Sequence, residues 1–92
     1  MGEIAREIEQ RLGAHFQPSD LLVRDDSARH AGHAGHNGQG ESHFFVRIES
    51  AAFAGLGRVA RQRAVNAVLA DLLASRVHAL ALQCRAPGEA HG

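Results

Sequence analysis

The sequence contains neither tryptophan nor tyrosine, and it has only one cysteine, Cys84. Four phenylalanines must therefore supply all of the aromatic packing. A single thiol excludes an internal disulfide, and it also excludes an iron–sulfur cluster held only by this chain's thiolates, since such a cluster takes a full set of cysteines. One unpaired cysteine is typical of a protein from a reducing compartment.

Net charge and long apolar runs are also missing. Ten basic and ten acidic residues cancel, which argues against a chain-wide polyanion binder but leaves room for a local basic patch. No apolar run approaches the roughly 20 residues of a membrane span. Residues 1–11 lack the apolar core of a signal peptide, so we expect a cytoplasmic protein.

What is present suits one small folded domain over residues 1–92. The apolar content of 45% is ordinary for a folded protein. An apolar stripe at every fourth position predicts a helix over residues 2–12 that ends near Gly13. The members of this stripe are Ile4, Ile8, Leu12 and Phe16.

Two strands are expected next, over residues 21–25 and 44–49, paired antiparallel. In the second, Phe44, Val46 and Ile48 alternate with polar or exposed positions and should point inward. Ser50 can cap a short turn through Phe53.

A long helix is expected over residues 58–74, followed by a last strand over residues 77–84. The buried stripe of this helix comprises Val65, Val68, Leu69 and Leu72. A helical crossover suits a parallel pairing of the second and third strands. The prediction is an α+β domain of order α-β-β-α-α-β, with a three-stranded mixed sheet, helices on one face and a loose tail over residues 87–92.

Residues 25–45, DDSARHAGHAGHNGQGESHFF, have no apolar period and carry His30, His33, His36 and His43 among four glycines. We expect a flexible loop over about residues 27–42. Imidazole is the commonest protein metal ligand, so a loop with several histidines is a natural place for function.

His78 is expected to begin the last strand, near His43 at the start of its parallel neighbour. The far end of the loop and His78 could therefore meet, although a half-buried polar residue is the commoner role for such a histidine. His33 and His36 are either solvated repeats or spare ligands that bind zinc or copper loosely. His43 is either a surface residue or a support for a ligand.

Arg58, Arg61 and Arg63 crowd the start of the long helix, where the helix dipole favours acidic residues instead. They are either a solvated helix start or a contact for phosphate or for an acidic protein surface. The sequence GLGR at residues 55–58 has the wrong spacing for a GXXG loop, which weakens recognition of single-stranded RNA but not a weaker DNA contact. We find no nucleophile with a base beside it, and we expect no enzyme and no small-molecule substrate.

Several spaced motifs resemble the BolA family, in the same order, over about residues 8–87. They are DDS at 25–27, HAGH at 30–33, GESHF at 40–44, FAG at 53–55, RVARQRAVN at 58–66 and VHALAL at 77–82. Gln62 and Ala90 depart from the pattern, since many members have histidine and tryptophan there.

This resemblance implies a type II KH-like fold and a shared [2Fe–2S] cluster, with His30 and His78 as ligands. A monothiol glutaredoxin would supply its own cysteine and that of bound glutathione. Two histidines can replace two thiolates on one iron, as in Rieske centres. The implied function is an adaptor in iron–sulfur cluster trafficking or iron sensing. A DNA-binding transcriptional regulator acting through residues 58–63 is the alternative, and a simple histidine-rich metal binder is a third.

Overall fold

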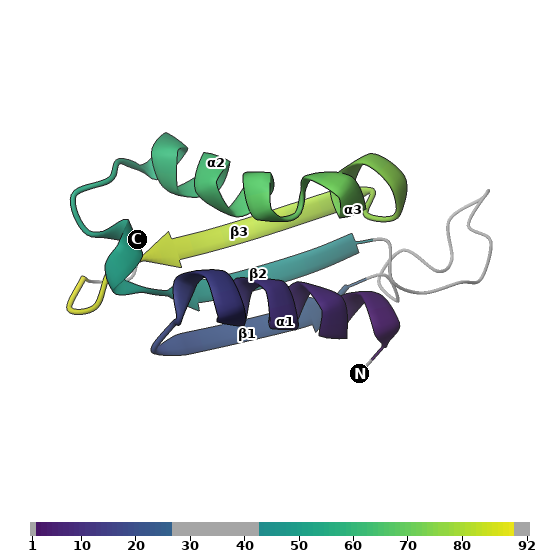
Figure 1. Ribbon diagram of the computed structural model, residues 1–92, viewed down its shortest axis with the longest axis horizontal. Helices are drawn as coiled ribbons and strands as arrows, with labels where there is room; N and C mark the ends of the chain where they lie inside the picture. Colours follow the sequence, from purple (N-terminus) through teal and green to yellow (C-terminus); the bar gives the residue numbers. More distant parts are fainter. Residues whose placement is uncertain (1, 27–42, 90–92) are drawn as a thin grey trace.

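The computed structural model describes residues 2–26 and 43–89 (Figure 1). The elements follow the expected order: α1 (Glu3–Phe16), β1 (Asp20–Asp25), β2 (His43–Glu49), the 3-10 helix η2 (Ala51–Phe53), α2 (Arg58–Val68), α3 (Ala70–Ser75) and β3 (Ala79–Arg85). The sheet order is β1-β2-β3, in which β2 is antiparallel to β1 and parallel to β3. The predicted mixed sheet is confirmed.

The helices cover one face of this sheet. Figure 1 shows α1 along β1 and β2, with α2 and α3 running along β3. Phe44, Val46 and Ile48 of β2 are buried, as their alternation predicts, and they share one core with the buried stripe of α1. The whole predicted stripe of α1 is buried. The opposite face of the sheet carries polar and charged side chains, including the ion pairs Arg47–Asp20 and Arg85–Glu49.

The first helix runs past its predicted end at Gly13 and continues to Phe16. Phe16 packs against Phe53 with ring centroids 5.1 Å apart, and the buried Ser50 hydroxyl donates to the Phe16 carbonyl at 2.7 Å. Gln17 then adopts a left-handed conformation and donates its N–H to the Gly13 carbonyl. These contacts with distant residues outweigh the weak helix propensity of glycine.

The predicted helix over residues 58–74 is divided at Leu69, between α2 and α3. Neither glycine nor proline marks this position, and Leu69 itself is buried. The last strand begins at Ala79 and not at Val77 as predicted. Val77 donates its N–H to the Leu72 carbonyl at 2.8 Å, so its backbone closes the end of α3. In the described ranges 2–26 and 43–89, every helix is too short or too polar to cross a membrane.

Candidate functional site

One edge of the sheet gathers the ends of segments that lie far apart in the sequence. Asp25 of β1 pairs with Phe44 of β2, and Asp26 donates its N–H to the His43 carbonyl at 2.7 Å. In the parallel ladder, His43 pairs with Ala79, the first residue of β3. The chain therefore leaves the described part at Asp26 and returns to it at His43, next to the residue that precedes β3.

That residue is His78, and its ring lies close to His43. The two ring centroids are 6.1 Å apart, with the rings nearly perpendicular at 83°. His43 is half-buried and His78 is exposed. The expectation that His78 lies near the start of β2 is confirmed, although His78 itself lies one residue before β3 and not within it. Two imidazoles at one edge offer nitrogen donors suited to iron, zinc or copper.

The other histidines proposed as ligands, His30, His33 and His36, lie outside the described residues. Within residues 2–26 and 43–89, no group of three or more histidine, cysteine, aspartate or glutamate side chains could hold a metal ion. The described part of this edge therefore contributes two imidazoles, and a metal site here would need further ligands from elsewhere.

Cys84 lies at the other end of β3 and cannot join that pair. It is separated from Ala79 by five strand positions, which corresponds to roughly 17 Å. The thiol is half-buried against the core, and burial raises its pKa. A raised pKa disfavours the thiolate that binds metal or attacks disulfides. Cys84 behaves as a small hydrophobic residue packed against the core.

The three arginines at the start of α2 have different environments. Arg58 and Arg63 are exposed, and neither forms an ion pair with another described residue. The side chain of Arg61 is only 12% exposed and binds both carboxylate oxygens of Glu89, at 2.6 and 2.7 Å. Of the two interpretations of this cluster, the solvated helix start does not describe Arg61, which is turned toward β3.

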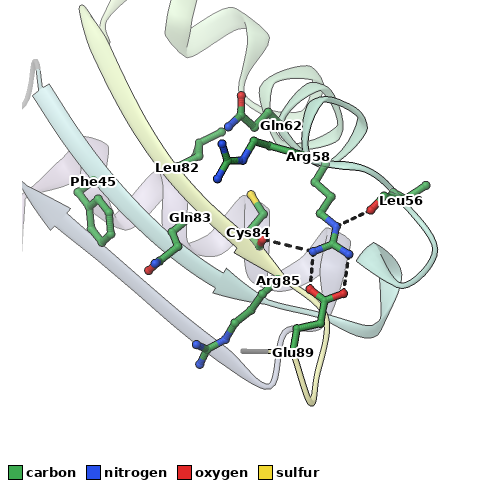
Figure 2. Close-up of a pocket in the computed structure, with 10 residues that line it drawn as sticks. Phe45, Leu56, Arg58, Gln62, Leu82, Gln83, Cys84, Arg85 and Glu89 are labelled. Atoms are coloured by element: carbon green, nitrogen blue, oxygen red, sulfur yellow. Dashed lines mark hydrogen bonds and ion pairs between the residues drawn. The ribbon is translucent and has the colours of Figure 1, made fainter. Parts of the chain in front are cut away.

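The Arg61–Glu89 pair lies in a pocket of about 690 Å³ beside the start of α2. In Figure 2, Arg58 extends from α2 toward Leu82 and Cys84, whereas Arg85 points away on the other side of β3. Arg61 and the N–H of Ala86 lower the pKa of Glu89 to about 2. The tail is thus held at Glu89, although looseness was predicted from residue 87 onward; residues 90–92 lie outside the described part.

Sequence reasoning missed Glu89 as the partner of Arg61. The topology contained a signal for it, because a helix that connects two parallel strands starts near the end of the second strand. The residues after β3 are therefore brought to the first turn of α2. No spacing rule identifies which acidic residue there meets which arginine.

Known proteins resemble this chain in both sequence and structure. A family model described as "BolA-like protein" matches residues 12–89. An uncharacterised protein from the region 5' of cobS in a Sinorhizobium species is 51% identical over 83 residues, which cover 89% of each chain. The "DNA-binding transcriptional regulator BolA" of Vibrio cholerae is 48% identical over 75 residues, which cover 82% of this chain and 67% of that one.

Among solved structures, the BolA domain of SufE1 from Arabidopsis thaliana superposes with a TM-score of 0.87 at 38% identity. The match covers 98% of this chain and 99% of the domain. Some curated relatives are much longer: the chain spans 25% and 54% of two proteins from Arabidopsis thaliana.

Proposed function

Because the chain belongs to the BolA-like protein family, we propose that it is a non-catalytic adaptor in iron–sulfur cluster trafficking or iron sensing. In this proposal it shares a [2Fe–2S] cluster with a monothiol glutaredoxin in the cytoplasm. The cluster is the cargo of the pair. This chain contributes imidazole ligands, and the glutaredoxin contributes thiolates from its own cysteine and from bound glutathione.

The observation that carries the proposal is the position of His78. Its ring is exposed, lies beside His43, and stands at the edge where the histidine-rich segment begins and ends. The donor set fits a shared cluster, because imidazole can bind iron whereas the single thiol is half-buried at the far end of β3. The missing thiolates must then come from a partner. We propose His30 as the second ligand from this chain.

The test is to mix the apo-protein with a cluster-loaded monothiol glutaredoxin and to record visible absorption and circular dichroism spectra. We expect a spectrum that differs from that of the glutaredoxin alone, and His78→Ala should abolish the difference. His15→Ala is the matched control, because His15 is exposed in the last turn of α1. An unchanged spectrum for His78→Ala would remove His78 from the ligand set.

A second candidate function is DNA binding in transcriptional regulation. Arg58 and Arg63 are exposed near the start of α2 and have no ion-pair partner in the described part of the chain. The relative from Vibrio cholerae is named a DNA-binding transcriptional regulator. Titration of a labelled DNA duplex tests this function, and replacing both arginines with glutamine should weaken binding and flatten its salt dependence.

A further inference from the structure

We propose that the pocket beside the start of α2 binds a phosphodiester group of DNA, and that Glu89 of the same chain occupies its central cation, Arg61, until the phosphate displaces it. The proposal rests on the second candidate function. It adds where the phosphate binds, and it adds that Glu89, which follows β3, controls access to Arg61.

The guanidinium of Arg61 is oriented to bind an anion through two of its oxygens. Its Nε donates to the Leu56 carbonyl at 2.8 Å, and Nη1 lies 3.5 Å from the Cys84 carbonyl oxygen (Figure 2). Backbone groups of two segments thereby fix the plane of the side chain. The remaining edge presents two parallel N–H groups, which bind phosphate as well as carboxylate in a bidentate manner.

The carboxylate of Glu89 is bound to Arg61 in a way that lets another anion displace it. The side chain of Glu89 is 41% exposed and follows a turn at Pro87 and Gly88. Solvent and salt therefore reach the carboxylate side of this ion pair and screen it. Because the pKa of Glu89 is about 2, its carboxylate stays charged at any physiological pH. Competition by another anion, and not protonation, is therefore what would open the site.

The surroundings favour a nucleic-acid phosphate over a carboxylate-rich peptide. Arg58 lines the same pocket without an ion-pair partner in the described ranges, so displacement of Glu89 would leave two cations facing one anion. The side chain of Gln62 lines the pocket as well. Arginine and amide side chains are among the groups that contact nucleic-acid phosphates. An acidic peptide remains as a competing outcome of the test.

The experiment measures binding of a fluorescein-labelled DNA duplex by anisotropy over a series of salt concentrations. Glu89→Gln should bind about two- to fivefold more tightly than the unaltered protein, as expected for the loss of a competing ion pair whose carboxylate is exposed to solvent. Its salt slope should stay unchanged, because Arg61 contacts the same phosphate in both complexes once Glu89 has been displaced. Glu9→Gln is the matched control, since it makes the same change in net charge on the exposed side of α1. The double variant Arg61→Gln with Glu89→Gln should lose the gain.

A second measurement tests anion binding at Arg61 independently of DNA binding. Inorganic phosphate should shift the Arg61 Nε–H resonance in an NMR titration of Glu89→Gln, with circular dichroism confirming that the variant is folded. If no variant binds DNA but phosphate still shifts this resonance, the DNA function fails while the anion site stands. Equal effects of Glu89→Gln and Glu9→Gln, or a silent resonance, would overturn the proposal. Tighter binding of a glutamate-rich peptide than of DNA would overturn DNA as the ligand.

Discussion

The imidazole rings of His43 and His78 meet nearly at right angles, 6.1 Å apart, at the edge where β2 and β3 begin. The parallel register brings them together, since His43 pairs with Ala79. One ring is half-buried on a strand, and the other is exposed just before a strand. Both therefore have backbones fixed by the fold.

We predict that replacing His78 and replacing His30 will have unequal effects on the mixed complex with a glutaredoxin. His78→Ala removes a donor for which only His43 lies close by in the described part, whereas His33 follows His30 by three positions and can substitute for it. The spectrum of the complex should be lost with His78→Ala and weakened less with His30→Ala. The double variant of His30 and His33 should approach the result for His78→Ala. Equal and complete loss with His30→Ala alone would contradict substitution by His33.

We predict that the isolated chain binds no stable [2Fe–2S] cluster. Its only thiol, Cys84, is half-buried, and burial raises its pKa. Anaerobic reconstitution with iron and sulfide, without any thiol partner, should leave no stoichiometric absorbance after desalting. Addition of a glutaredoxin with glutathione is the positive control. A stoichiometric cluster in the chain alone would show that the fold supplies ligands beyond those assigned here.

We predict that Ser50→Ala destabilises the domain by about 1–3 kcal/mol. The Ser50 hydroxyl is buried, donates to the Phe16 carbonyl at 2.7 Å and accepts from the Ala52 N–H at 3.1 Å. Its removal leaves two backbone groups without these partners. Urea unfolding followed by far-ultraviolet circular dichroism measures the effect, because the chain lacks tryptophan and tyrosine.

The control for this prediction is Ser75→Ala, at an exposed serine whose hydroxyl donates within α3 to the Asp71 carbonyl. A surface change of this kind should alter the free energy of unfolding by less than about 0.5 kcal/mol. Similar losses for both variants would mean that the buried bridge from Ser50 to Phe16 has no special role.

We predict that the contribution of Glu89 to stability disappears in acid. The pKa of Glu89 is lowered from 4.5 to about 2, first by the hydrogen bonds from Arg61. A lowered acid pKa stabilises the folded state above the unfolded pKa, and this stabilisation is lost as the pH falls through the folded value. Glu89→Gln should therefore be less stable than the unaltered protein at pH 6, and the difference should shrink toward pH 2.5.

Urea unfolding at a series of pH values measures this difference. Glu9→Gln on the exposed side of α1 serves as the control, because Glu9 forms no ion pair with a described residue. A difference between Glu89→Gln and the unaltered protein that stays constant from pH 6 to pH 2.5 would show that the ion pair does not stabilise the fold.

The sequence alone determined the element order, the inward face of β2 and the buried stripe of α1, because these follow from local period and side-chain chemistry. It also pointed to the neighbourhood of His43 and His78, since a parallel crossover fixes which strand ends meet. The BolA resemblance also follows from the sequence, because the motifs that carry it are runs of residues in a fixed order.

Only the tertiary structure decided features that depend on contacts between distant segments. Packing of Phe16 on Phe53 carries α1 past Gly13. The ion pair between Arg61 and Glu89 turns Arg61 toward β3, whereas Arg58 and Arg63 stay exposed. Local propensity cannot predict such outcomes, because each is settled by a partner that is far away in the sequence and close only after folding.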